Sequence, residues 1–290
     1  MKERPRVRAL SRRQCLVGAA ATGVGLAVAS GSAASVMKTA RSGGRALPDL
    51  SDPDTALRTM VRMQGSLREE DVPWWFTGVV FAVTGDDETP RPLVRFEGME
   101  IYWFRHITDG FILGGHTLTF FCDFATGEYL QEFDNPWTRR KEIVKPAVQG
   151  GNLGFKYSRD GIRPVRLDGT PLGPAPTGPF RPQFHQVGGQ VLLQHQTVYP
   201  PGLPPMHGQR QTLSADEGDV ADARLAAVPA TFSSTVFMGW LRWMGMKGIP
   251  GHVVWHASGA KLRSIGELPA AYRERALREF PDRMSAKPRT

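Results

Sequence analysis

The stretch GMEIYWFRHITDGFILGGHTLTFFCDFATGEYLQEF, residues 98–133, decides the fold, because long alternating apolar segments flank an Asp-Gly pair at residues 109–110. Asp-Gly favours a two-residue turn with positive φ, so we expect a hairpin of residues 99–108 and 111–123. A further turn then leads into residues 129–133 as a third strand. The stretch therefore predicts a meander of three consecutive antiparallel strands.

The two longer predicted helices lie near the two ends of the mature chain. Asp52 before Pro53 is a helix-start pattern, Gly65 ends that helix, and residues 269–280 carry an apolar stripe at helical spacing. The other predicted elements are a strand at residues 74–83, a hairpin around Gly188-Gly189, a short helix at residues 214–227, and a strand at residues 251–256 that ends at a Ser258-Gly259 turn. This pattern indicates a mainly β fold, an antiparallel β-barrel or sandwich with N-terminal and C-terminal helices.

The hairpin register predicts on which face of the sheet two of the seven histidines lie. With Asp-Gly as the two-residue turn, His106 pairs with Leu113 and Trp103 pairs with His116. His106 then shares an apolar face with Tyr102, whereas His116 lies on the opposite face. The two histidines are therefore not expected to share one site.

His252 and His256 are the preferred candidates for chemistry. They are four residues apart with Trp255 between them, so they lie on one face of a strand or of a helix. We predict that they and His106 act in catalysis, because histidine transfers protons near neutral pH. Along a strand, four residues span roughly 13 Å, too far for both histidines to ligate one ion. No metal site and no cofactor is predicted.

Aromatic residues provide a second signal, since seven tryptophans are many for one domain. Tryptophan and tyrosine can line a pocket for a flat apolar ligand while presenting a polar edge. Trp74, Tyr102, Trp103 and Trp255 are therefore predicted to bind a small hydrophobic ligand. The alternative is that these side chains fill the core.

The remaining polar candidates have simpler interpretations. Glu97, Glu100 and Asp109 flank predicted strands and are expected to be solvated. Cys122 follows an apolar period-two pattern, which is typical of a buried structural thiol. The only other cysteine, Cys15, lies in the N-terminal segment, so no disulfide is expected in the mature chain.

Residues 1–34 have the features of a twin-arginine (Tat) signal peptide. A basic region that ends with Arg12-Arg13 precedes an apolar run at residues 16–29, and small residues follow it. The run is shorter than the roughly 20 residues that a membrane-spanning helix needs. We therefore expect recognition by the Tat export machinery, a periplasmic or secreted location, and no stable membrane span.

Removal of this leader changes the charge balance. The full chain has a net charge of +8, of which the leader carries +5, so the mature chain is only about +3. This is an ordinary surface charge, and no basic stripe interleaved with aromatic residues favours nucleic acid as a partner. The expected organisation is a leader at 1–34, a linker at 35–52, one β-rich domain at 53–284 and a tail at 285–290.

Several segments carry a resemblance to a known family. They are ALRTMVRMQGSL (56–67), WWFTGVVFAV (74–83), EGMEIYWFR (97–105), FFCDFATGEYLQEFDNPWT (120–138), HQTVYP (195–200) and GHVVWHASGAKLRSIGELP (251–269). From about Asp54 to Met284 the chain resembles an uncharacterised bacterial and fungal family, domain of unknown function number eighteen thirty-eight, whose members often carry Tat signals. One departure is Arg139-Arg140, where the family pattern continues with Gly-Glu. The resemblance implies no activity and no catalytic residues.

Three functions remain open at this level. The first is a periplasmic, cofactor-free enzyme of lyase, isomerase or hydrolase type that acts on a small apolar or aromatic molecule in a barrel cavity. The second is a carrier or sensor of a hydrophobic ligand without chemistry. The third is an interaction protein of the envelope, which would expose a large apolar patch.

Overall fold

The computed structural model describes residues 46–85, 87–172, 182–198 and 206–284. The predicted signal peptide, residues 1–34, and the predicted tail, residues 285–290, lie outside this part of the chain. The described residues from Ala46 onward belong to one compact unit.

That unit is built around a large curled antiparallel sheet that forms a half-barrel, and strands account for 51% of the structure. The strand order is β8-β7-β3-β2-β1-β13-β12-β11-β10-β9, and β6 also pairs with β3. Because β1 pairs with β13, the first and last strands of the sheet lie side by side at its centre. The strands are β1 (Val72–Thr84), β2 (Asp87–Ile107), β3 (Gly110–Cys122), β6 (Ala147–Gly150), β7 (Leu153–Ser158), β8 (Gly161–Arg166), β9 (Gln183–Val187), β10 (Gln190–Val198), β11 (Met206–Asp216), β12 (Thr231–Met238) and β13 (Gly251–Lys261).

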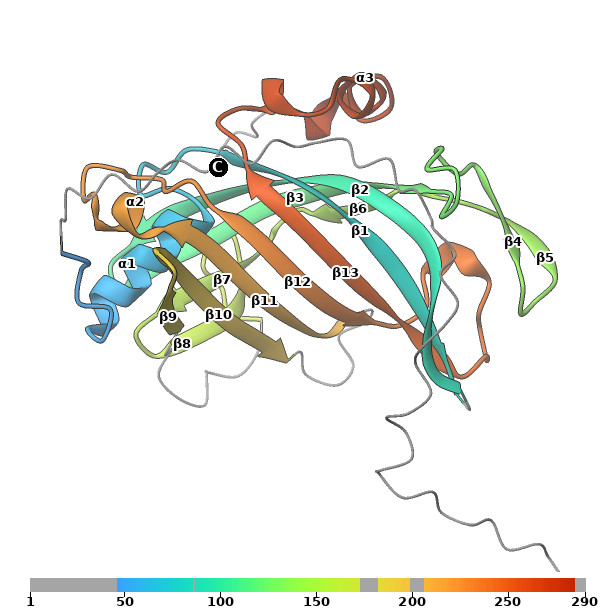
Figure 1. Cartoon of the computed structure of the whole chain (residues 1–290), viewed down its shortest axis with the longest axis horizontal. Helices are drawn as coiled ribbons and strands as arrows, with labels where there is room; N and C mark the ends of the chain where they lie inside the picture. The colour runs from blue at the N-terminus through green and yellow to red at the C-terminus, as the bar shows by residue number, and fades with distance from the viewer. Residues whose placement is uncertain (1–45, 86, 173–181, 199–205, 285–290) are drawn as a thin grey trace, which may run out of the picture. The chain divides into compact units, whose positions relative to one another are not determined.

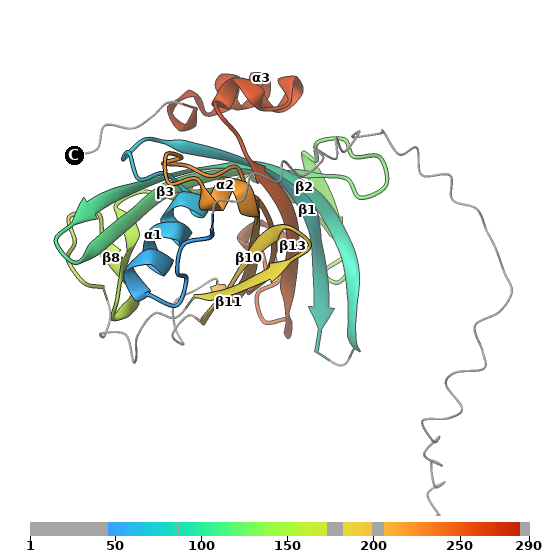
Figure 2. The same cartoon turned by 60° about the vertical axis from the view of Figure 1, so that its left-hand side comes forward.

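Helices cover both faces of the curl (Figure 1). The helix α1 (Pro53–Gln64) begins at the Asp52 cap, whose carboxylate accepts a hydrogen bond from the Thr55 amide, and it ends at Gly65 as predicted. It lies inside the curl, whereas α3 (Ala270–Glu279) lies on the outer face (Figure 2). The short helices are α2 (Glu217–Ala221), η2 (Arg242–Met244), η3 (Ile265–Glu267) and η4 (Pro281–Arg283).

The concave face holds two apolar clusters. The first joins α1 to both halves of the sheet, through residues such as Met60, Trp74, Phe104 and Leu193. The second lies farther along the same face and is centred on aromatic contacts among Phe96, Phe121 and Trp255. Trp243 from the η2 segment and Phe133 from the strand β4 (Glu132–Asn135) close over it. Burial of these side chains supplies most of the driving force for folding.

The convex face is covered by α3. Tyr272 of α3 is fully buried against Trp75 and Phe120, and its hydroxyl donates a hydrogen bond of 2.7 Å to the carbonyl of Leu118. Met99 and Ile101 complete this third cluster. Strand β1 is therefore covered on both faces, by α1 at Trp74 and by α3 at Trp75. This explains the near-continuous apolar sequence of β1.

The central prediction, a mainly β fold with an antiparallel β-barrel or sandwich and helices at both ends, is confirmed, and the sheet forms a half-barrel. The hairpin register, however, is wrong by two residues, because the turn falls on Thr108-Asp109 and His106 pairs with Phe111. An even shift leaves every side chain on its face, so the predicted separation of His106 from His116 still holds.

The predictions for a third meander strand and for a turn at Ser258-Gly259 are wrong. Tyr129 makes only an isolated bridge to Cys122, and β4 (Glu132–Asn135) pairs with β5 (Arg140–Ile143) in a separate sheet, because β6 and β7 occupy the free edge of β3. The predicted turn at Ser258-Gly259 is continuous strand within β13. Gly259 is needed there for close approach, since a Cβ would lie 2.4 Å from the Trp75 carbonyl oxygen. Residues 214–216 extend β11, so only part of 214–227 is helical.

Candidate functional site

A carboxyl group lies on the concave face between the two apolar clusters. Strand alternation places Tyr102, Glu100, Gly98 and Phe96 on this face of β2, with Thr117 opposite Glu100 on β3. Protein atoms surround the Glu100 carboxyl group closely, and part of the residue remains accessible to solvent. A group in this position can meet a small molecule that enters the half-barrel.

Two hydroxyl groups hold this carboxyl in place. Thr117 Oγ1 donates to Glu100 Oε1 at 3.1 Å, and the Tyr102 hydroxyl donates to the same carboxylate. Burial raises the pKa of Glu100 from 4.5 to about 7, although both hydrogen bonds oppose the shift. Near neutral pH the group therefore exists in both its acidic and its basic form, as an acid–base catalyst requires.

Trp74 and Lys261 extend the same row of side chains. Trp74 on β1 pairs with both Glu100 and Lys261, and its indole N–H donates to the Gln64 carbonyl. Lys261 Nζ donates to the carbonyls of Arg62 and Gly65 at 2.8 and 3.0 Å. Burial, with the nearby positive charge of Arg62, lowers the pKa of Lys261 to about 7. Lys261 thus holds the C-terminus of α1 on the sheet rather than facing a ligand.

A second polar group lies on the β10–β11 part of the same face. His195 Nε2 is 2.8 Å from Gln211 Oε1, and because a carbonyl oxygen only accepts, Nε2 carries the proton. Burial lowers the pKa of His195, so the ring is neutral and Nδ1 is an acceptor. Nδ1 is buried without a hydrogen-bond partner among the residues that the structure describes. A ligand hydroxyl or amine could satisfy it.

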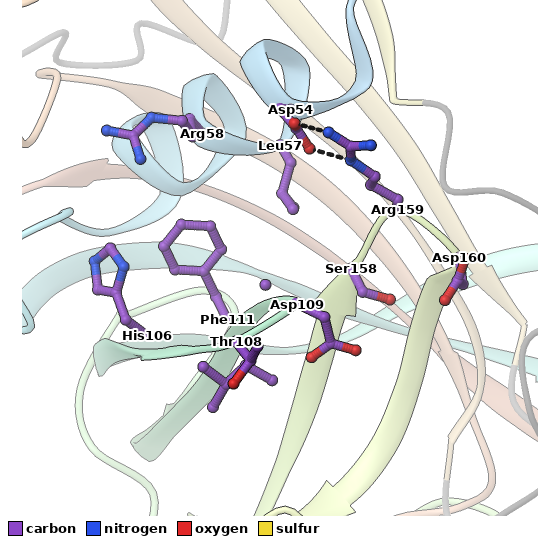
Figure 3. Close-up of a pocket in the computed structure, with 12 residues that line it drawn as sticks. Asp54, Leu57, Arg58, His106, Thr108, Asp109, Phe111, Ser158, Arg159 and Asp160 are labelled. Atoms are coloured by element: carbon purple, nitrogen blue, oxygen red, sulfur yellow. Dashed lines mark hydrogen bonds and ion pairs between the residues drawn. The ribbon is translucent and has the colours of Figure 1, made fainter.

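A cavity of about 500 Å³ lies at another place, between the start of α1 and the β2–β3 and β7–β8 turns. The Arg159 guanidinium on the β7–β8 turn forms a bidentate ion pair with Asp54 of α1 and so joins two walls (Figure 3). Figure 3 shows Arg58 and His106 on one side of this cavity, where the Phe111 ring packs against His106, and Asp160 on the other side. Its size is in the range of small-molecule sites.

A family model described as a protein of unknown function (DUF1838) matches residues 69–149. These residues, called the DUF1838 segment below, are thus similar to that family. The resemblance found in the sequence is thereby confirmed over these residues. No curated protein matches the chain.

One solved structure that is similar comes from Nitrosomonas europaea and carries the provisional name AttH. The sequence identity is 10% and the TM-score is 0.21. The match covers 69% of this chain and 53% of the Nitrosomonas protein, so the chain spans about half the length of that relative.

The DUF1838 segment contains Glu100 and both of its hydrogen-bond donors, Tyr102 and Thr117. It also contains His106, whose side chain lines the cavity at the start of α1. The Nε2 atom of His106 lies 3.0 Å from the Leu67 carbonyl oxygen. Lys261 and His195 come from strands outside the segment. The concave site is therefore assembled from the family segment and from the C-terminal strands together.

The predicted histidine pair does not lie at the concave site. Alternation along β13 puts Trp255 on the concave face and both His252 and His256 on the convex face. His256 is exposed, and its Nδ1 lies 3.3 Å from Thr235 Oγ1. Both residues do share one face of one strand, as predicted, but neither is near Glu100 or His106.

The four predicted ligand-binding aromatics are also divided. Trp74 and Tyr102 lie beside Glu100, and Trp255 lies farther along the same concave face. Trp103 is on the convex face, where its ring packs against Gly114. Buried packing accounts for Trp74 and Trp255, although the indole N–H of Trp255 has no hydrogen-bond partner within the described part of the chain.

Glu100 was expected to be solvated, and this expectation is wrong. Its position at even spacing from Tyr102 and Phe104, which are part of or packed against the buried core, could have indicated the inner face. Sequence alone could not show that this face curls over the carboxyl group. Among residues 46–85, 87–172, 182–198 and 206–284, there is no group of three or more His, Cys, Asp or Glu side chains suited to a metal ion. No helix within the same residues is long and apolar enough to cross a membrane.

Proposed function

We propose that the protein binds a small, largely apolar or aromatic molecule on the concave face and that Glu100 transfers a proton to or from it. The observation that carries the proposal is a carboxyl group that two hydroxyl groups orient on the inner face of the half-barrel. The reaction would be a cofactor-free lyase, isomerase or hydrolase-type step. Aromatic and apolar residues of the same face would bind the body of the molecule.

The role of each residue follows from its chemistry. The protonated Glu100 carboxyl can donate to a developing anion, and its ionised form can accept a proton from an acidic C–H or O–H group. Tyr102 and Thr117 orient the carboxyl and stabilise its ionised form. His195, with a neutral ring fixed by Gln211, is a candidate anchor for a donor group on the same molecule. His252 and His256 have no part in this proposal because they lie on the convex face.

We also propose that the enzyme works in the periplasm after Tat export. Arg12-Arg13, the apolar run and the small residues after it support this location. The test is to replace both arginines with lysine (Arg12→Lys with Arg13→Lys) and to compare cell fractions. We expect the wild-type chain in the periplasm in a shortened form and the double variant in the cytoplasm at full length. A double variant that is exported normally would contradict Tat export.

The catalytic proposal can be tested with a panel of compounds in place of one chosen substrate. Mature protein is incubated with a library of phenols, aromatic acids and short aromatic esters, and the loss of each compound is followed by mass spectrometry. The Glu100→Gln variant keeps the size of the side chain but cannot exchange a proton, so it should lose turnover by about 100-fold or more. Glu128→Gln, which changes an exposed carboxylate in a loop, is the matched control.

Three outcomes separate the possible functions. Turnover that depends on Glu100 and not on Glu128 would support the enzyme. Turnover that Glu100→Gln leaves unchanged would exclude Glu100 as the acid–base group. A compound that binds to the wild type and to Glu100→Gln, and is converted by neither, would instead identify a carrier.

A further inference from the structure

We infer that the cavity at the start of α1 is a second binding site and that it takes a small carboxylic acid with an apolar body. This site is separate from Glu100 and does not depend on the function proposed above. It is lined by the first turns of α1, the β2–β3 turn with His106 and Phe111, and the β7–β8 turn with Ser158 (Figure 3). Its volume of about 500 Å³ is sufficient for a molecule of one ring or a short chain.

The charges of the lining leave one cation available. Arg159 is neutralised by Asp54, and Asp109 is neutralised by Lys156, whose Nζ lies 2.5 Å from Asp109 Oδ2. Arg58, by contrast, has no hydrogen bond or ion pair with another of the described residues and is exposed at the cavity. A planar guanidinium with free N–H groups is suited to bidentate binding of a carboxylate.

His106 lines the same cavity as Arg58 and adds a polar group to it (Figure 3). The Leu67 carbonyl oxygen lies near Nε2, so Nε2 carries a proton, and the backbone N–H of His106 donates to Glu69 at 2.6 Å. The Nε2 contact thereby fixes the ring, and the amide contact fixes the backbone of the same residue. Its Nδ1 has no partner among the residues that the structure describes, and a ring that also carries a proton on Nδ1 can donate a hydrogen bond to a ligand carboxylate.

The position of the body of the ligand follows from the apolar and acidic residues. Leu57 of α1 and Phe111 of β3 form the apolar lining, and the Phe111 ring packs edge-on against His106 at 4.7 Å between centroids. Asp160, at the far end, repels an anion and favours one orientation, with the carboxylate toward Arg58. A ligand with a carboxylate next to a ring or short chain fits both the cation at Arg58 and the apolar lining of Leu57 and Phe111.

The test uses benzoate as the probe, with benzyl alcohol and inorganic phosphate as comparisons. Benzyl alcohol keeps the ring without the charge, and phosphate keeps the charge without the ring. Binding is followed by NMR through the amide signals of Gly110 and Phe111, which report on the cavity. We expect benzoate to shift these signals and to bind about tenfold more tightly than either comparison probe, as one charge-assisted hydrogen bond would allow.

Variants then identify the cation. Arg58→Gln removes the charge at an exposed helix position without loss of helix propensity, and it should weaken benzoate binding about tenfold. Arg242→Gln, which removes an exposed arginine of η2 outside the cavity lining, is the matched control and should bind like the wild type. Thermal unfolding of both variants shows whether they are folded.

Several results would overturn the inference. One is that benzoate at millimolar concentration leaves the Gly110 and Phe111 signals unchanged. Another is that a folded Arg58→Gln variant binds benzoate as tightly as the wild type. Equal binding of benzyl alcohol would exclude recognition of the charge. Equal binding of phosphate would exclude recognition of the apolar body.

Discussion

Thr117 Oγ1 donates a 3.1 Å hydrogen bond to Glu100 Oε1 across the β2–β3 pair, on the inner face of the sheet. This contact joins β3 to a carboxyl group on β2. Burial raises the pKa of that carboxyl group to about 7. Burial favours the neutral acid and the hydrogen bond favours the ionised form, so the two effects oppose each other. The pH dependence of stability should therefore report on this pair directly.

The first prediction concerns Glu100 and pH. Its pKa is about 7 in the folded state and 4.5 in the reference state, so between these values the folded protein holds a proton that the unfolded chain has lost. This contribution is complete below pH 4.5 and is lost as the pH rises through 7. We expect the wild-type unfolding free energy to fall by up to about 3 kcal/mol over this range relative to Glu100→Gln. Denaturant titrations at several pH values measure it, with Glu128→Gln as control, and parallel curves for wild type and Glu100→Gln would contradict it.

The second prediction concerns Thr117. Thr117→Val keeps the shape of the side chain and removes the donor, so the ionised form of Glu100 loses one stabilising contact. We expect the pKa of Glu100 to rise above its wild-type value of about 7 and the stability at pH 8 to fall by about 1 kcal/mol. Carbon-13 NMR titration of the carboxyl signal measures the shift. Thr77→Val, at an exposed position of β1, should leave the signal in place, and a lower pKa in Thr117→Val would disprove the interpretation.

The third prediction concerns Lys261. Its pKa falls from 10.5 to about 7 on folding, so between these values the unfolded chain holds a proton that the folded protein lacks. Stability therefore rises with pH from about 7 to 10.5, the opposite direction from Glu100. Lys261→Met should remove this rise, and the variant also loses the two hydrogen bonds to the end of α1. The unfolding free energy of both proteins at pH 7, 8.5 and 10 tests this, and an equal slope in the two would refute it.

The fourth prediction concerns Gly259. A Cβ at this position would lie 2.4 Å from the Trp75 carbonyl oxygen and 2.5 Å from the Phe232 ring. Gly259→Ala must separate β13 from β1 or displace Phe232, so we expect a loss of about 3 kcal/mol in stability. In Gly266→Ala the nearest atom, Ser264 Oγ at 3.3 Å, can move, and the loss should stay below about 1 kcal/mol. If residues 258–259 instead formed a turn, the two variants would have similar stability.

The fifth prediction concerns Arg139, where the resembled family carries glycine. Its φ of 54° lies in the left-handed region, which costs an L side chain roughly 1–2 kcal/mol. Arg139→Gly removes this cost but makes the unfolded chain more flexible, so we expect a net stabilisation of about 1 kcal/mol or less. Arg140→Gly, in the adjacent strand β5, should destabilise instead. Thermal unfolding of the pair measures the difference, and two destabilised variants would contradict the prediction.

The sequence by itself determined the elements that depend on neighbouring residues. The α1 boundaries followed from Asp52, Pro53 and Gly65, since caps and helix ends are local. The hairpin around Gly188-Gly189 was predictable from its two glycines, and it pairs His185 with Leu192. Which face each histidine of the β2–β3 hairpin occupies was also predictable, because side chains alternate strictly along a strand.

Only the tertiary structure decided what those faces meet. The strand pairing of β1 with β13 brings Lys261 next to Trp74, and no local pattern encodes contacts between residues nearly 190 positions apart. The curl of the sheet turns Glu100 from an expected surface residue into a buried acid, and it leaves His252 and His256 on the outside. Local residue pattern sets which side of a strand a group occupies, but the pKa and accessibility of that group depend on the long-range packing that surrounds it.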